Sequence, residues 1–248
     1  MKSIVVANWK MNPQTFAQAK KLFEATRKAS EAAKSVSVIV APPSIFLREL
    51  ARNYKGRKIS FAAQNAHSQK DGAYTGEVSM PEVKDAKASA VIIGHAERRA
   101  MGETNEETRA KVNAALAQRL QPIFCIGEHK RSGSGEHFLF VKEQLRAGLS
   151  DVAPANLGKI VIAYEPVWAI GATEAMSSRQ MHEMAIFIRK SLVGSHGEKG
   201  IKAKILYGGS IDETNARDML DNGDVAGFIL GRASTDAEKF TALIKSLA

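Results

Sequence analysis

Three side chains, Lys10, His95 and Glu165, are of the types needed to move a proton beside a carbonyl group. A carboxylate can accept a proton, an imidazole can polarise a carbonyl oxygen or transfer protons, and an ammonium group can offset anionic charge. Each residue follows a short β-branched segment. Taken alone, each could also be a solvated loop residue or the end of a strand. Together they predict a proton-transfer site, provided that the segments before them end at the same place.

Two glycine-containing segments indicate where a phosphate would bind. Gly208–Ser210 and Gly231–Ser234 each follow a strand-like segment and lead into a possible helix start. Backbone N–H groups at such positions bind phosphate, although these glycines could also be turn residues with positive φ. Combined with the acid–base set, they predict proton abstraction on a small phosphorylated substrate.

The sequence predicts neither a metal nor a cofactor. It contains no cluster of Cys and His ligands of the kind that holds a transition metal. No Gly-x-Gly-x-x-Gly motif follows the first strand-like segment, where a dinucleotide-binding fold would carry it. The chemistry is therefore expected to come from side chains and backbone alone.

Eight short β-branched segments must position these residues, and stretches with helical spacing of apolar residues lie between them. The strand-like segments are Ile4–Ala7, Val36–Ala41, Ile59–Ala63, Ala90–Ile93, Pro122–Ile126, Ile160–Tyr164, Ala203–Tyr207 and Val225–Leu230. The clearest helical stretches are Thr15–Ala29, Thr108–Leu120, Phe138–Leu149, Met181–Leu192 and Ala237–Leu247.

Alternating strands and helices predict an α/β fold with a parallel sheet. The 248 residues divide into eight units of 31 residues each, which fits a closed (β/α)8 TIM barrel of one domain spanning residues 1–248. An open, doubly wound sheet is the alternative. In a barrel, functional residues lie at the carboxyl ends of the strands, which is where Lys10, His95 and Glu165 are expected.

Composition excludes several other classes of protein. A single cysteine, Cys125, rules out an internal disulfide framework, and no apolar run approaches the roughly 20 residues of a membrane span. The net charge of +9 is not accompanied by a run of five basic residues, and only 6% of residues are aromatic. We therefore expect no nucleic-acid or membrane partner. With no recognisable signal sequence, the expected location is the cytoplasm.

Five blocks of the sequence resemble the triosephosphate isomerase family. They occur in the family's order, the matches run from residue 7 to residue 234, and the first and fourth blocks are highly specific. The blocks are Asn8–Asn12, Gly94–Arg99, Cys125–Glu128, Ala163–Gly171 and Tyr207–Ser210.

The resemblance implies interconversion of dihydroxyacetone phosphate and glyceraldehyde 3-phosphate through an enediolate, the reaction for which acid and base tuning is well described. Glu165 would carry the proton between two substrate carbons, and His95 would act as a neutral electrophile. Asn8 and Lys10 would hold the substrate, with Glu97 fixing the ammonium group of Lys10.

The resemblance also assigns the groups around the phosphate and the base. Ile170 and Ile229 would form an apolar clamp over Glu165 that excludes water. Backbone N–H groups at four positions would bind the phosphate, namely Gly171, Ser210, Gly231 and Arg232.

Two loops have expected roles from the same resemblance. The segment Trp168–Ser178 corresponds to the lid over the site. The loop His67–Ser79 corresponds to the segment that enters a neighbouring subunit, with Thr75 close to the partner's site, so a homodimer is implied. A loop of this length would be poorly held on a monomer.

Four residues depart from the family's pattern. Ala96 replaces a serine and removes a hydroxyl that could bond a retracted Glu165 carboxylate, while Thr173 and Glu174 replace a glycine and a lysine of the lid. Arg232 replaces the second glycine of a pair at the phosphate site. If that position needs a left-handed backbone, Arg232 costs about 1–2 kcal/mol and displaces an N–H donor. If ordinary dihedral angles suffice, which we favour, its guanidinium points outward or adds positive charge near the phosphate.

Two alternatives to a triose-phosphate isomerase stay open at this point. The chain could be a barrel whose lid and phosphate grip have decayed and which serves as a binding or regulatory protein. It could also be an isomerase of a longer sugar phosphate with a reshaped lid.

Overall fold

The computed structural model describes residues 2–172 and 176–248. The expected lid residues Thr173 and Glu174 lie outside this described part. Eight parallel strands form a closed barrel in sequence order, and the pairing of β1 with β8 closes it. The strands are β1 (Ser3–Asn8), β2 (Val36–Ala41), β3 (Ile59–Ala63), β4 (Ala90–Ile93), β5 (Gln121–Ile126), β6 (Val161–Tyr164), β7 (Lys204–Tyr207) and β8 (Gly227–Leu230). The predicted (β/α)8 TIM barrel is confirmed.

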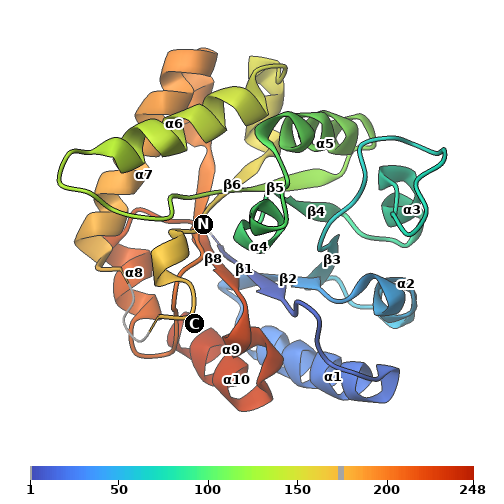
Figure 1. Cartoon of the computed structure of the whole chain (residues 1–248). Helices are drawn as coiled ribbons and strands as arrows, with labels where there is room; N and C mark the ends of the chain where they lie inside the picture. The colour runs from blue at the N-terminus through green and yellow to red at the C-terminus, as the bar shows by residue number, and fades with distance from the viewer. Residues whose placement is uncertain (1, 173–175) are drawn as a thin grey trace.

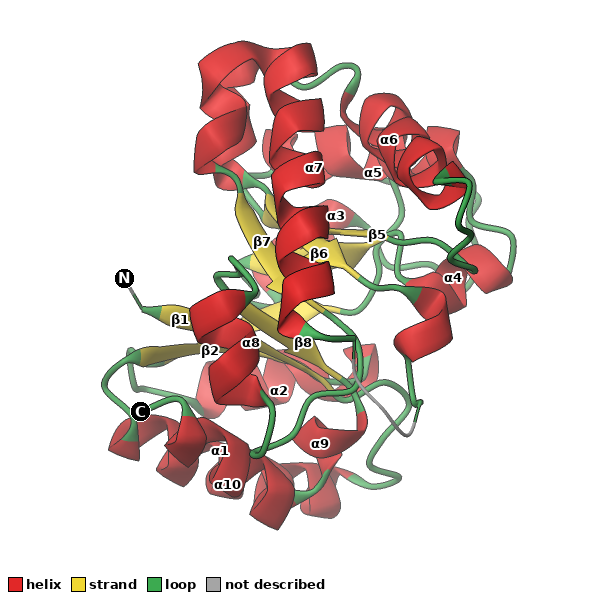
Figure 2. Cartoon of the chain, turned by 90° about the vertical axis from the view of Figure 1, so that its left-hand side faces the viewer, coloured by secondary structure: helices red, strands yellow, loops and turns green. Residues whose placement is uncertain are grey.

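Helices surround the strands, as Figure 1 shows, and Figure 2 shows α7 and α8 lying over the outside of the barrel. The α-helices are α1 (Phe16–Ala32), α2 (Ser44–Asn53), α3 (Met80–Asp85), α4 (Ala96–Ala100), α5 (Asn105–Ala117), α6 (Glu136–Leu149), α7 (Ser178–His196), α8 (Ala216–Asn222), α9 (Arg232–Thr235) and α10 (Ala237–Ser246). Three short 3-10 helices are η1 (Pro154–Lys159), η2 (Val167–Ala169) and η3 (Gly197–Lys202). None of these helices is long and apolar enough to cross a membrane.

The start of α5 shows why some predicted boundaries are wrong. The helix begins three residues before the predicted Thr108 because the Thr104 hydroxyl accepts the Glu107 N–H at 3.1 Å. The Glu107 carboxylate in turn accepts the Thr104 N–H at 2.7 Å, which completes a capping box. The helix ends early as well, because Arg119 adopts a left-handed backbone with φ of 55°.

Side chains alternate along each strand between two apolar layers. In β1, Ile4 and Val6 belong to the barrel interior, whereas Val5 and Ala7 pack against the surrounding helices. Strands that are buried on both faces read as continuous apolar runs, which explains why the sequence showed no alternation in them. The candidate site residues of reactive type lie beyond these apolar runs, after the strands have ended.

Strand order decides which ends become neighbours. β6, β7, β8 and β1 are consecutive in the closed barrel, and β4 is separated from β6 only by β5. The carboxyl ends of parallel strands form one rim, so the residues that follow β1, β4 and β6 face the same opening.

Candidate active site

The opening at the carboxyl ends of the strands contains a cavity of about 680 Å³. It brings together every predicted site residue except Glu97, which reaches the site through Lys10. The predicted residues that line it are Asn8, Lys10, His95, Glu165, Ile170, Gly171, Ser210, Ile229, Gly231 and Arg232.

Glu165 and His95 face each other in this cavity. The Oε1 atom of Glu165 lies 3.3 Å from Nε2 of His95, and both side chains are almost fully buried. His95 precedes α4, and its Nδ1 atom accepts the Glu97 N–H at 3.1 Å. Because Nδ1 is an acceptor, a neutral imidazole carries its proton on Nε2, the nitrogen that faces the carboxylate. The pair can therefore combine a proton acceptor with a neutral hydrogen-bond donor.

Ala96 contacts the Glu165 carboxylate through its main chain, although it lacks a side-chain hydroxyl. The Ala96 N–H donates to Oε2 of Glu165 at 3.3 Å. The carboxylate thus contacts the start of α4 through one oxygen and the imidazole of His95 through the other. The departure at position 96 removes a side-chain contact and leaves this backbone contact in place.

Lys10 reaches the cavity from an unusual backbone conformation. Its φ is 53°, in the left-handed region that non-glycine residues seldom adopt. The Asn8 side chain accepts the Lys10 N–H at 3.1 Å, and Gln64 donates to the Lys10 carbonyl at 2.8 Å. The ammonium group of Lys10 donates to Oε1 of Glu97 at 2.5 Å, as the resemblance implied. Strain of this kind persists only where neighbours hold the residue in place.

Gln64 is a positioning residue to which the sequence assigned no role. Its amide nitrogen donates both to the Lys10 carbonyl at 2.8 Å and to the Ala41 carbonyl at 2.9 Å. It therefore ties the end of β2 to the loop after β1. Its place directly after the third strand-like segment was the available signal, but the partners of an amide cannot be read from that position.

Gly208, which has no side chain, leaves room for the Glu165 carboxylate. A Cβ atom at Gly208 would lie 2.6 Å from Cγ of Glu165 and 2.7 Å from Cγ2 of Ile229. Ile229 and the aliphatic part of Glu165 therefore pack on the same glycine. This places one half of the predicted apolar clamp beside the carboxylate, while Ile170 lines the same cavity.

The backbone of Arg232, which lines the same cavity, shows which of the two expectations for this residue holds. It is the first residue of α9 and has no positive φ, so the left-handed strain considered above does not arise. Its guanidinium does not point away from the site. The Nη2 atom lies 3.5 Å from where a Cβ of Gly171 would be.

Both ends of the expected lid are held by buried polar groups. At the first end, the Trp168 indole N–H donates to Glu128 at 2.9 Å, and the Tyr164 hydroxyl donates to the same carboxylate at 2.9 Å. At the second end, the Met176 N–H donates to the Tyr207 hydroxyl oxygen at 3.1 Å. Burial raises the pKa of Tyr207 to about 12 and raises the pKa of Tyr164 well above its usual range. Both phenols are therefore neutral at ordinary pH.

Three buried or partly buried charged side chains, those of Glu103, Lys111 and Arg99, hold the end of β4 just before His95. Glu103 accepts the Gly94 N–H at 3.1 Å and forms an ion pair with Lys111. Arg99 donates to the Gly94 carbonyl at 2.9 Å, and burial lowers the pKa of this guanidinium. Burial also raises the pKa of Cys125, which belongs to the barrel interior. Of these contacts the sequence indicated only an amphipathic helix, because the residues are separated along the chain.

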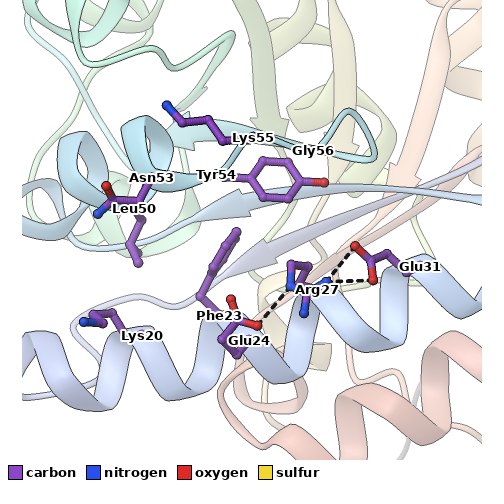
Figure 3. A pocket seen from close by; sticks show the side chains of 10 residues that line it. All are labelled: Lys20, Phe23, Glu24, Arg27, Glu31, Leu50, Asn53, Tyr54, Lys55 and Gly56. Atoms are coloured by element: carbon purple, nitrogen blue, oxygen red, sulfur yellow. Dashed lines mark hydrogen bonds and ion pairs between the residues drawn. The ribbon is translucent and has the colours of Figure 1, made fainter.

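A second hollow, of about 450 Å³, lies outside the barrel between α1 and α2 (Figure 3). Its principal charges neutralise one another, since Arg27 contacts Glu24 at 2.9 Å and Glu31 at 2.7 Å. The Tyr54 hydroxyl accepts two backbone N–H groups. The residues that line this hollow include no acid–base pair comparable to Glu165 and His95. Within residues 2–172 and 176–248, no group of three or more His, Cys, Asp or Glu side chains is arranged to hold a metal ion.

A closed (β/α)8 barrel with a carboxylate, an imidazole and an ammonium group at its carboxyl-end rim has the architecture and the residue types of barrel enzymes that use general acid–base chemistry. Comparison with known proteins narrows the class. The family model described as triosephosphate isomerase matches residues 3–247. The chain belongs to the triosephosphate isomerase family.

Curated relatives support this assignment over almost the whole chain. The chain is 39% identical over 246 residues to a protein named triosephosphate isomerase from Endomicrobium trichonymphae, covering 98% of each chain. It is 40% identical over 249 residues to the protein of the same name from Flavobacterium johnsoniae, covering 99% of each. It is 39% identical over 251 residues to that of Porphyromonas gingivalis strain ATCC 33277, covering 99% of each.

Proposed function

We propose that this chain interconverts dihydroxyacetone phosphate and D-glyceraldehyde 3-phosphate by proton transfer through an enediolate. The observation that carries the proposal is the 3.3 Å approach of Glu165 and His95 inside a cavity that Lys10 also lines. Family membership supplies the substrate class. Neither the barrel that only binds nor the isomerase of longer sugar phosphates has an observation in its favour.

The residues divide the reaction among them. Glu165 removes a proton from the carbon next to the carbonyl and returns it to the neighbouring carbon. The Nε2–H of His95 donates a hydrogen bond to the oxygen on which negative charge develops, and the ammonium group of Lys10 offsets that charge. The same Nε2 passes its proton to that oxygen and takes up the proton of the neighbouring hydroxyl, so that the second proton moves between the two substrate oxygens. Ile170 and Ile229 exclude water around the carboxylate. The two proton transfers, one between carbons and one between oxygens, need no group beyond these, so the proposal includes no metal or cofactor.

The remaining substrate contacts bind rather than react. Asn8 holds the loop that carries Lys10, and Glu97 orients its ammonium group. The phosphate lies at the opposite end of the cavity. Backbone N–H groups of Gly171, Ser210, Gly231 and Arg232 bind it there. The Ser210 N–H donates to the Ala169 carbonyl at 3.2 Å in this structure, so it has to leave that partner to bind the phosphate.

We also propose a homodimer formed through the loop His67–Ser79, with Thr75 close to the partner's site. Apolar side chains follow the neighbouring strands β1, β2 and β4, where Met11 is 86% exposed, Ile45 79% and Met101 77%. Tyr74, in the loop after β3, is 45% exposed. Because these four strands are consecutive in the barrel, the four side chains are on one side of the mouth, as an interface requires.

The rest of the proposal concerns the whole chain. Residues 1–248 form one domain that works in the cytoplasm on a small phosphorylated substrate, without a nucleic-acid or membrane partner. The closed barrel, whose first and last strands pair, supports a single domain.

Replacement of the base tests the catalytic proposal. In a coupled assay of glyceraldehyde 3-phosphate isomerisation, we expect Glu165→Gln to lower kcat by at least about 10³-fold, because a positioned general base contributes roughly 10²–10⁴-fold. Glu198→Gln is the matched control, since Glu198 is exposed in η3. Equal rates for wild type and Glu165→Gln would overturn the proposal. Faster turnover of a five-carbon sugar phosphate than of the triose phosphate would favour an isomerase of the longer substrate.

A further inference from the structure

We propose that the Arg232 guanidinium binds the substrate phosphate directly, adding a charged side-chain donor to the backbone grip. This inference rests on the proposed function for the identity of the substrate. It does not rest on that function for the presence of an anion site, which is argued from the cavity itself.

The position of Arg232 is the first observation in favour of this inference. The residue follows β8 and lines the cavity, and its guanidinium reaches across to the first part of the lid. Its Nη2 and Cζ atoms lie 3.5 and 3.9 Å from the Cβ position of Gly171. The side chain thus spans two of the positions whose N–H groups are proposed to hold the phosphate, and an anion between them lies within its reach.

The charges of the residues that line the cavity are the second observation in favour of phosphate binding by Arg232. The described lining carries three cations, Lys10, Arg232 and Lys239, against four carboxylates, one of which is Glu165. Lys10 is already engaged by Glu97. Without Arg232, carboxylates would outnumber cations in the lining by four to two, which is an unfavourable entrance for a dianion.

Nearby acidic groups are committed elsewhere. Asp212 accepts hydrogen bonds from the Thr214 N–H at 2.9 Å and the Thr214 hydroxyl at 2.6 Å. Asp236 caps α10 and accepts the Glu238 N–H at 3.0 Å. Among residues 2–172 and 176–248, no carboxylate lies within 4.0 Å of the Arg232 guanidinium. Its planar set of donors can therefore bind phosphate oxygens in pairs.

This role predicts a particular division of kinetic effects. A contact to the phosphate is made equally in the bound substrate and in the transition state, so its loss raises KM and leaves kcat nearly unchanged. A charge-assisted hydrogen bond of this kind corresponds to roughly a 10- to 100-fold change in affinity.

The test measures anion binding and turnover separately. The variants are Arg232→Gln, Arg232→Lys and the control Arg146→Gln, which removes the same charge from an exposed residue of α6. Calorimetric titration with inorganic phosphate gives Kd, and the coupled assay with glyceraldehyde 3-phosphate gives KM and kcat. Thermal unfolding verifies that each variant is folded.

We expect Arg232→Gln to raise both Kd and KM by about 10- to 100-fold with kcat within about threefold of wild type. Arg232→Lys should recover part of the loss, because it keeps the charge without the planar donors. Unchanged Kd and KM in Arg232→Gln would overturn the inference. So would a loss confined to kcat, or an equal loss in Arg146→Gln.

The same experiment separates this inference from the proposed function. If wild type binds inorganic phosphate through Arg232 but does not isomerise the triose phosphate, the function fails and the anion site stands. If wild type is active and Arg232→Gln matches it in both Kd and KM, the function stands and the inference fails.

Discussion

Gly208→Ala tests whether the space beside Glu165 determines catalysis. A Cβ atom at this position would lie 2.6 Å from Cγ of Glu165, about 0.8 Å short of the 3.4 Å at which ordinary contacts begin. It would also meet Ile229 at 2.7 Å. Since Ile229 belongs to the packed barrel interior, the more mobile carboxylate is the group that moves.

The displacement sets the expected magnitude. A reacting group moved by about 1 Å can lose on the order of 10²-fold in rate. We therefore expect Gly208→Ala to lower kcat by about 10²-fold, equivalent to about 2.7 kcal/mol of activation free energy. The effect on KM should be smaller, because the carboxylate contributes mainly to the chemical step.

A matched glycine provides the control. Gly194 is in α7, and a Cβ built there has no heavy atom within 4 Å. Gly194→Ala should leave kcat unchanged and stabilise the helix by up to about 1 kcal/mol. Steady-state kinetics and urea unfolding of both variants are the measurements. A folded Gly208→Ala variant with kcat within threefold of wild type would refute the claim that this gap positions the base.

Two further predictions concern alkaline stability and assembly. The pKa of Tyr207, raised by burial to about 12, lies above its ordinary value of about 10, so its contribution to the free energy of unfolding is full below pH 10 and is lost as pH rises through 12. The free energy of unfolding, measured with urea, should fall less steeply between pH 10 and pH 12 for Tyr207→Phe than for wild type. Equal slopes of this free energy against pH would contradict the prediction. Sedimentation should show wild type at twice the mass of one chain. Ile45→Lys should shift it toward the monomer while Leu139→Lys, 69% exposed on α6, should not; a monomeric wild type would contradict the dimer.

The sequence was sufficient to predict the barrel and to bring Lys10, His95 and Glu165 to its mouth, but it gave no sign that Asp212, Glu213, Asp236 and Lys239 also line the cavity. Strands buried on both faces leave little freedom in residue type, so apolar β-branched runs marked all eight of them. Polar residues of reactive type then stood out at their ends, and the closed strand order brings Lys10, His95 and Glu165 together. The catalytic roles given to these residues stay predictions until the variants above are measured.

What the sequence could not supply is the set of contacts that hold these residues in place. The left-handed backbone of Lys10 is held by a local hydrogen bond to Asn8 and by one from Gln64, which lies 54 residues away and comes close only when β1, β2 and β3 pair. The buried pair of Glu103 and Lys111 likewise supports the end of β4 from a helix. Side-chain hydrogen bonds of this kind leave no periodic pattern in a sequence, whether their partners are near or far along the chain.

Ala96 and Arg232, the departures from the family's pattern that lie in the described part of the chain, share a physical feature. At Ala96 and at Arg232, the substitution changes a side chain where the backbone makes or permits the local geometry. The Ala96 N–H still contacts Glu165, and Arg232 takes the helical conformation that begins α9. By contrast, Gly208 borders Glu165 so closely that even a methyl group would collide with it. In this site kcat should therefore follow the space around the carboxylate, whereas the charge of residues at the rim should act on KM.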